Sequence, residues 1–79
     1  MEKQEVQTRV KQVVARVLKM DEDSIADEAN FIFDLGADSM QSLELVAGFE
    51  EEFEIEMDQD GALEIQSIDG AVTFINTYL

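Results

Sequence analysis

The stretch DLGADSMQSLELV, residues 34–46, decides the fold because it predicts where a loop ends and a helix begins. Asp38 is a favourable N-cap residue, and Gln41 three positions later can complete a capping box. We therefore predict a helix from Ser39 to about Phe53. Its first turn would contain Ser39, which could serve as a catalytic nucleophile, as a helix cap or as an attachment point for another group.

The predicted helix 39–53 is apolar around most of its circumference, which is unusual for so short a chain. Its polar arc is narrow, and Gly48 within it costs about 1 kcal/mol relative to alanine. The helix must therefore be covered on several sides, or it keeps apolar surface for a ligand or partner. The apolar positions are Met40, Leu43, Leu45, Val46, Ala47, Phe49 and Phe53.

Two further helices are predicted from periodicity. Apolar residues at i, i+4 and i+7 spacing indicate an amphipathic helix ending near Leu18. Another follows Ser67, a plausible N-cap, and a short helical turn is expected at 60–65. The expected buried residues of the first helix are Val6, Val10, Val13, Val14, Val17 and Leu18, and those of the last are Ile68, Ala71, Val72, Ile75, Tyr78 and Leu79.

The connections complete the prediction of an all-α fold. Residues 19–38 form a long loop whose apolar side chains (Ile25, Phe31, Ile32, Phe33 and Leu35) are expected to pack over the core. FEIEM, residues 53–57, alternates like a strand, but it has no convincing partner strand and is interpreted as an extended loop. Residues 1–79 should thus form a single domain, a small four-helix bundle of three main helices and one short helix, with a long loop between the first two.

Composition excludes several classes of function. The chain has 79 residues, a net charge of −14 and neither cysteine nor histidine. It therefore lacks the usual general base and any thiolate, so a self-sufficient enzyme is not expected. All five basic residues lie within the first nineteen positions, and such an acidic surface should repel nucleic acid and attract basic proteins. With no membrane-spanning run and no signal-peptide core, we expect a cytoplasmic monomer.

The sequence offers three possible sites. GADSMQ lacks the second glycine of a nucleophile elbow, which argues against catalysis by Ser39. Residues 56–67 align partly with a calcium-binding loop, but Ser67 occupies the position of the bidentate glutamate, so no metal site is predicted and only weak divalent-cation binding stays open. A helix N-terminus favours a bound phosphate, so a phosphodiester on Ser39 would be stabilised there. These arguments leave cap and attachment point about equally supported.

A resemblance to a known family favours the attachment point over the cap. DLGADSMQSLELV, followed by FEEEFEIEM at 49–57, resembles the prosthetic-group site and second helix of bacterial-type acyl carrier proteins. RVKQVVARVLKMDEDSIADEANF at 9–31 resembles the first helix and loop of that family, and IQSIDGAVTFINTYL at 65–79 resembles its last helix. The resemblance therefore spans essentially the whole chain.

The resemblance implies a carrier rather than an enzyme. Ser39, flanked by Asp38 and Met40, would bear 4′-phosphopantetheine, transferred from coenzyme A by a phosphopantetheinyl transferase (holo-ACP synthase). The thiol of that group would hold acyl intermediates of fatty acid or related lipid or polyketide synthesis as thioesters. An acidic protein-interaction module, with Ser39 only as a cap, is the alternative.

The resemblance also implies two surfaces. Acyltransferases, ketosynthases and other partners with basic surfaces would bind the acidic helix, and the acyl chain would enter a pocket among the helices. Met40 stands where the family usually has leucine, and Gln41 where an acidic residue is frequent, which suggests a specialised pathway. The implied recognition residues are Asp38, Met40, Glu44, Glu50, Glu51 and Glu56, and the implied pocket residues are Val10, Phe31, Leu45, Val46, Ile55, Ala62 and Ile65.

Overall fold

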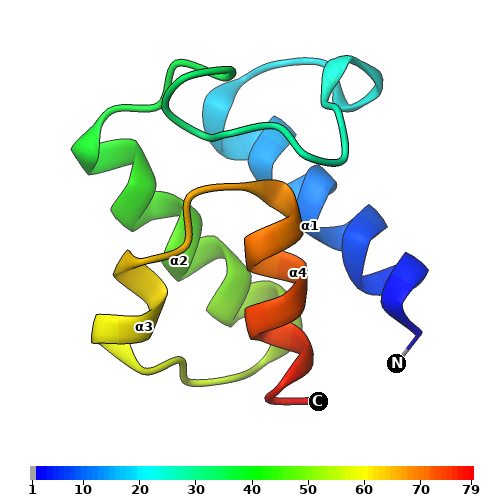
Figure 1. Cartoon of the computed structure of the whole chain (residues 1–79), viewed down its shortest axis with the longest axis vertical. Helices are drawn as coiled ribbons and strands as arrows, with labels where there is room; N and C mark the ends of the chain where they lie inside the picture. Colours follow the sequence, from blue (N-terminus) through cyan, green and yellow to red (C-terminus); the bar gives the residue numbers. More distant parts are fainter. Residues whose placement is uncertain (1) are drawn as a thin grey trace.

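The computed structural model describes residues 2–79, apart from the side chains of Gln59 and Leu63. Three longer helices surround a common core, and a short fourth helix lies beside α2 (Figure 1). Within the described residues there is no β-strand, so the predicted all-α fold is confirmed. The helices are α1 (Lys3–Leu18), α2 (Ser39–Phe53), α3 (Gln59–Leu63) and α4 (Ile68–Asn76), with a 3₁₀ turn η1 (Glu22–Ser24).

The core is built from the apolar stripe of α1 packed against α2 and α4. Val6, Val10, Val13 and Val14 are fully buried, as their helical spacing predicts. Val17 and Leu18, at the end of the stripe, are only partly buried. Phe49 and Leu45 of α2 and Ile68 and Ile75 of α4 supply the largest buried side chains opposite them.

Gly48 allows α1 and α2 to approach closely. A Cβ atom added there would lie 2.8 Å from Cγ1 of Val13, a separation that real Cβ atoms essentially never show. The helix-propensity cost of this glycine therefore has a packing explanation that periodicity could not reveal.

The long loop between α1 and α2 closes one end of the molecule, where α2 begins (Figure 1). Ile25 and Phe31 are buried as predicted, and the Phe31 N–H donates to the Gln66 carbonyl at 2.9 Å. The prediction that Ile32 and Phe33 also pack over the core is wrong, because their side chains are 52% and 87% exposed. A turn that begins at Asn30 holds this pair in its exposed position.

Lys11 of α1 ties the same loop to the helix by an ion pair with Asp27. The hydrogen bond from the Lys11 ammonium, together with its positive charge, holds the pKa of Asp27 below its usual value. The pair therefore stabilises the fold while Asp27 is ionised, and this contribution is lost as the pH falls through the lowered pKa.

The C-terminal half follows the predicted order, with a correction at its end. The Ser67 hydroxyl accepts a hydrogen bond from the Gly70 N–H and caps α4 as predicted, and residues 53–57 lead from α2 into an extended connection. The expected burial of Tyr78 and Leu79 is wrong: they are 37% and 48% exposed because α4 ends at Asn76. The Tyr78 hydroxyl instead accepts a hydrogen bond from the Asp58 N–H at 2.8 Å.

Candidate functional site

At the start of α2, the helix is capped by Asp38 and not by Ser39. Asp38 Oδ1 accepts a hydrogen bond from the Gln41 N–H at 2.8 Å, and Gln41 Oε1 accepts one from the Asp38 N–H at 3.1 Å. This is the predicted capping box, and Asp38 has the extended backbone of an N-cap residue. Ser39 is the first helical residue and is exposed, and among the described residues its hydroxyl makes no hydrogen bond. Asp38 therefore caps the helix, and the exposed serine oxygen is not needed for that role.

The chain before Ser39 is held in a defined conformation. Gly36 has a positive φ of 74°, a conformation in which other residues are strained. Ala37 is buried, and its N–H donates to the Phe31 carbonyl at 2.8 Å. The loop is thus fixed to the core immediately before the serine, so Ser39 is presented by a rigid support.

A phosphodiester on Ser39 fits this position. The first N–H groups of a helix have no partner within the helix, and the helix dipole places partial positive charge there. The Gln41 N–H is already bonded to Asp38, so Ser39 and Met40 supply the remaining donors nearest the serine oxygen. The sequence has no basic residue after Lys19. Backbone N–H groups, rather than a lysine or arginine of the same region, would therefore offset the phosphate charge.

A small cavity lies among α2, α3 and the preceding loop, one helical turn from the serine. Its volume is about 100 Å³, and Ser42, three residues after Ser39, forms part of its wall. The Ser42 hydroxyl donates to the Asp38 carbonyl at 3.1 Å, which links the cavity wall to the capping box. The wall comprises Phe31, Ile32, Ser42, Leu45, Val46, Phe49, Ala62, Ile65 and Gln66.

The implied acyl-pocket residues only partly coincide with this wall. Phe31, Leu45, Val46, Ala62 and Ile65 are in it, whereas Val10 lies fully buried in the core stripe of α1 and Ile55 lies half-buried in the link after α2. Sequence reasoning missed Ile32, Phe49, Ser42 and Gln66 as wall residues. Phe49 is one of the apolar positions of α2, which periodicity alone does not divide between core and pocket, and the two polar side chains give no signal in a search for apolar positions.

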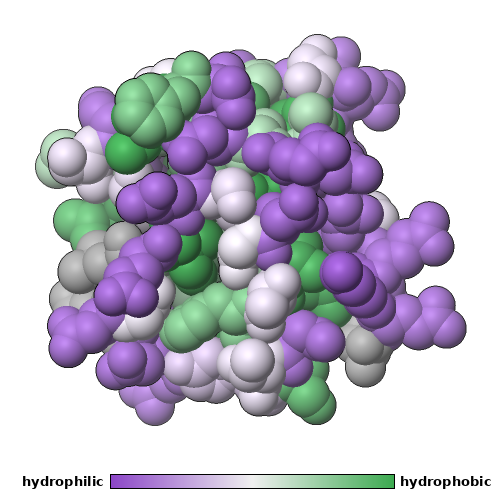
Figure 2. Space-filling view, viewed as in Figure 1, coloured by the Kyte–Doolittle hydropathy of each residue, from purple (hydrophilic) through white to green (hydrophobic). Residues whose placement is uncertain are grey.

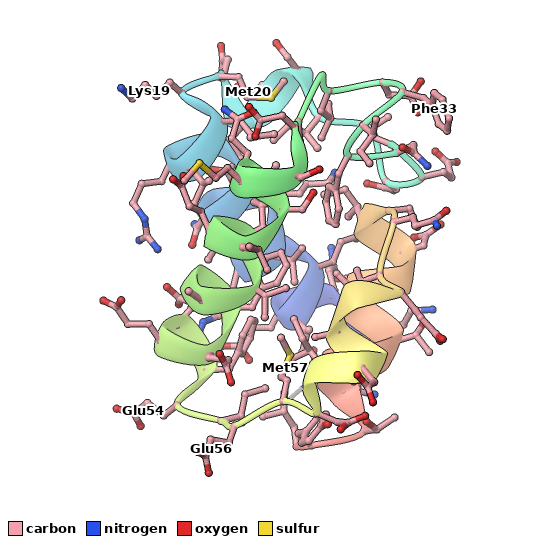
Figure 3. All side chains as sticks on the ribbon, turned by 90° about the vertical axis from the view of Figure 1, so that its left-hand side faces the viewer. Lys19, Met20, Phe33, Glu54, Glu56 and Met57 are labelled. Atoms are coloured by element: carbon pink, nitrogen blue, oxygen red, sulfur yellow. The ribbon has the colours of Figure 1, made fainter. Side chains whose placement is uncertain are left out.

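The acidic residues implied as a recognition surface differ in their exposure, their hydrogen bonds and their position in the molecule. Glu44 and Glu51 are exposed and lie two turns apart on α2. Glu50 is half-buried, and its carboxylate accepts a hydrogen bond from the Met57 N–H at 2.9 Å. Glu56 lies beyond the C-terminal end of α2, at the opposite end of the molecule from Phe33 (Figure 3). The neighbouring Glu52 pairs with Arg9 at 2.7 Å, so it contributes to the contact between α1 and α2.

Comparison with known proteins agrees with this arrangement. A family model described as a phosphopantetheine attachment site matches residues 8–75, which include the whole of α2 and the loop before it. The chain belongs to the phosphopantetheine-attachment family. Its prosthetic group is accordingly 4′-phosphopantetheine, and the sequence resemblance to acyl carrier proteins is confirmed.

The fold of this carrier is also found in a solved structure. A candidate acyl carrier protein from Mycobacterium tuberculosis superimposes with a TM-score of 0.85 and 23% sequence identity, covering 94% of this chain and 99% of the other. At that identity the likeness establishes the shared fold. The family match, in turn, identifies a carrier of a prosthetic group rather than an enzyme.

The alternative uses of the carrier's acidic residues find little geometric support. In the calcium-loop-like segment the Asp58 carboxylate accepts a hydrogen bond from the Gly61 N–H and thereby caps α3. Among the described residues, no group of three acidic side chains is placed to hold a metal ion.

None of the described helices has the length and apolar character needed to cross a membrane.

Proposed function

We propose that this chain is a discrete acyl carrier protein whose prosthetic group is attached to the Ser39 hydroxyl. The observation that carries the proposal is the division of roles at the start of α2. Asp38 and Gln41 cap the helix, so the neighbouring serine is exposed, rigidly presented and unoccupied by a structural hydrogen bond. When bound, 4′-phosphopantetheine would supply the thiol that the chain lacks and hold acyl intermediates as thioesters.

The cavity supports an acyl cargo. It begins one helical turn from the serine, and most of its wall is apolar, with Phe31, Leu45 and Phe49 among its buried members. An engineered apolar cavity of about 150 Å³ holds a molecule the size of benzene. The present cavity, at about 100 Å³, is smaller and would admit only a few carbon atoms of an acyl chain without rearrangement. Longer chains would require the loop or α3 to move.

The acidic face of α2 supports partners with basic surfaces. Glu44 and Glu51 are exposed on the same side of the helix, and Met40 and Ala47 lie between and beside them at helical spacing. A partner that meets this side must supply cations around an apolar centre. We expect the double substitution Glu44→Lys and Glu51→Lys to weaken turnover by such enzymes while the far-UV circular dichroism is unchanged. Loss of the helical spectrum would instead make these residues structural.

The methionine at position 40 supports the proposal that the carrier serves a specialised pathway within fatty acid, related lipid or polyketide synthesis. Its side chain is 72% exposed beside Ser39, so it lies where any enzyme working at the attachment site would touch it. The acyl carrier resemblance places leucine at this position. Met40→Leu should therefore improve use by enzymes of bulk fatty acid synthesis, and unchanged use would argue against a role for Met40 in pathway selection.

The absence of cysteine gives a direct test of the carrier function. The unmodified chain has no thiol, so any thiol in the purified product must come from an attached group. After incubation with coenzyme A, magnesium and a broad-specificity phosphopantetheinyl transferase, and removal of free coenzyme A, we expect one maleimide-reactive thiol per chain. No thiol after treatment with several transferases would contradict the proposal and favour an acidic interaction module.

A further inference from the structure

Exposed apolar side chains gather on both sides of Ser39 in the sequence. Phe33 is the most exposed of them at 87%, and Ile32 beside it is half exposed. Figure 2 shows apolar side chains at the surface over the loop that precedes α2. Adjacent exposed apolar side chains of this size commonly mark an interaction site. Of the six large exposed hydrophobic residues in the described part of the chain, four lie within twelve positions: Ile32, Phe33, Met40 and Leu43.

The exposure of Phe33 is fixed by the local hydrogen bonds. Asn30 Oδ1 accepts hydrogen bonds from the N–H groups of both Ile32 and Phe33 at 2.9 Å. Asp34 Oδ2 accepts one from the Asn30 N–H at 2.7 Å, and the Asp34 N–H donates to the Asn30 carbonyl at 3.0 Å. Phe31, immediately before the turn, is buried and anchors it to the core. The aromatic ring therefore projects from a closed turn, so binding would require little ordering of the backbone.

The position of Phe33 selects one class of partner. Figure 3 shows the ring pointing away from the body of the molecule, at the end where α2 begins. Enzymes that act on a carried acyl group reach it through the flexible prosthetic arm, so they need not cover the loop before α2 even where they contact Met40. The enzyme that attaches the arm, in contrast, must bring its active site to the Ser39 oxygen. An interface of ordinary size, about 800 Å² on each partner, centred on Ser39 would extend over the neighbouring loop.

The charges around this surface agree with such a partner. Asp34 directly follows Phe33 and Asp38 directly precedes Ser39 in the sequence, and no basic residue follows Lys19. Coenzyme A is itself anionic, so the transferase must supply the cations that hold it here. In the transfer, the Ser39 oxygen forms a bond to phosphorus and the diphosphate P–O bond of coenzyme A breaks. Adenosine 3′,5′-bisphosphate leaves, and the serine proton passes to a base of the transferase.

We propose that Phe33, kept exposed by the turn that begins at Asn30, is an aromatic anchor for the phosphopantetheinyl transferase. Its ring would insert into an apolar pocket of that enzyme, and lysine or arginine side chains of the enzyme would border the pocket. The inference rests on the proposed attachment at Ser39 and adds a second contact beside Met40. Aromatic side chains dominate the energetics of many interfaces, whereas most surrounding contacts contribute little. Truncating Phe33 should therefore weaken docking while leaving the reacting serine unchanged.

The test is the steady-state kinetics of loading by a broad-specificity phosphopantetheinyl transferase with coenzyme A and magnesium. We expect Phe33→Ala to raise the KM for the carrier about tenfold, with kcat within about twofold of the unsubstituted chain. Phe33→Leu, which keeps an apolar side chain, should recover most of this loss. Leu79→Ala is the matched control, because Leu79 is also exposed but lies at the C-terminus, at the end of the molecule away from the start of α2 (Figure 1).

A competition experiment measures docking without the reaction. The Ser39→Ala chain should inhibit loading of the unsubstituted chain, and adding Phe33→Ala to it should raise the inhibition constant about tenfold. Equal KM values for Phe33→Ala and Leu79→Ala, or equal inhibition by the two Ser39→Ala chains, would overturn the role of Phe33. If even the unsubstituted chain were not loaded, the attachment at Ser39 would itself be overturned. The two failures are therefore distinguishable.

Discussion

At the scale of single residues, the start of α2 depends on Asp38 rather than on Ser39. The Asp38 carboxylate accepts from the Gln41 N–H, and the Gln41 side chain returns a hydrogen bond to the backbone of Asp38. This reciprocal pair satisfies two donors that would otherwise face solvent. Ser39 can occupy the first helical position without a capping role because its neighbour performs that role.

The capping box can be tested by two substitutions at Asp38. Replacing Asp38 by alanine should lower the free energy of unfolding by about 1 kcal/mol, because the Gln41 N–H loses its acceptor. Asparagine keeps an acceptor oxygen and should cost only a few tenths of a kcal/mol. Urea unfolding followed by circular dichroism measures both. Equal stability of the two variants would show that the cap contributes little.

A second residue-scale prediction concerns Glu54, the C-cap residue that follows α2. Its φ of 54° is in the left-handed region, where a side chain costs roughly 1 kcal/mol and glycine does not. Glu54→Gly should therefore be more stable than Glu54→Ala by about 0.5–1 kcal/mol, although both remove the same charge. Thermal or urea unfolding of the pair supplies the measurement, and a more stable alanine variant would contradict the argument.

At the scale of elements, the contact between α1 and α2 is set by a glycine. Gly48 lies against Val13, whose side chain is fully buried. Arg9 adds a contact between the same helices: its guanidinium bonds to Glu52 and lies 4.8 Å from the centre of the Phe53 ring. The propensity of glycine alone would suggest replacing it, but the packing gives the opposite expectation.

Substitution of Gly48 tests this packing. Gly48→Ala should destabilise the fold by about 1–3 kcal/mol, because overpacking at Val13 exceeds the gain in helix propensity. Combined with Val13→Ala, which removes the opposing methyl groups, it should cost less than the sum of the two single changes by at least ~0.5 kcal/mol. Urea unfolding of the four chains forms the cycle. Stabilisation by Gly48→Ala alone would contradict the close approach.

Periodicity and capping predicted the helices well because both are local. The bounds of α2 and the buried stripe of α1 follow from neighbouring residues. The loop between them was predicted less well, since its apolar residues were expected to behave alike. Ile25 and Phe31 are buried, whereas Phe33 is exposed through hydrogen bonds to Asn30. The cavity was difficult to predict for the same reason, because Gln66 lines it together with residues of α2 that are distant in the sequence.

At the scale of the whole molecule, the charge distribution should govern stability and association. Nineteen acidic residues oppose five basic ones, and no basic residue occurs after position 19. Mutual repulsion among the carboxylates destabilises the compact state, and a partner with basic surfaces would relieve it. The chain is therefore expected to be more stable in salt and to bind its partners less tightly there.

Salt dependence tests this account. Raising sodium chloride from 10 to 200 mM shortens the Debye length from roughly 30 Å to less than 10 Å, and it should raise the melting temperature by about 5 °C. Magnesium chloride at the same ionic strength is the control for a specific cation site. Similar midpoints in the two salts support screening. A large increase at micromolar magnesium would contradict it and establish a divalent-cation site.

The central claim concerns one oxygen atom, that of Ser39, and it can be tested by locating the modification. The chain loaded by transferase and coenzyme A is digested, and the peptide containing residues 39 and 42 is fragmented in a mass spectrometer. We predict one phosphopantetheinyl group on Ser39, its complete loss in Ser39→Ala and its retention in Ser42→Ala. A group on Ser42, or a loaded Ser39→Ala chain, would contradict the account.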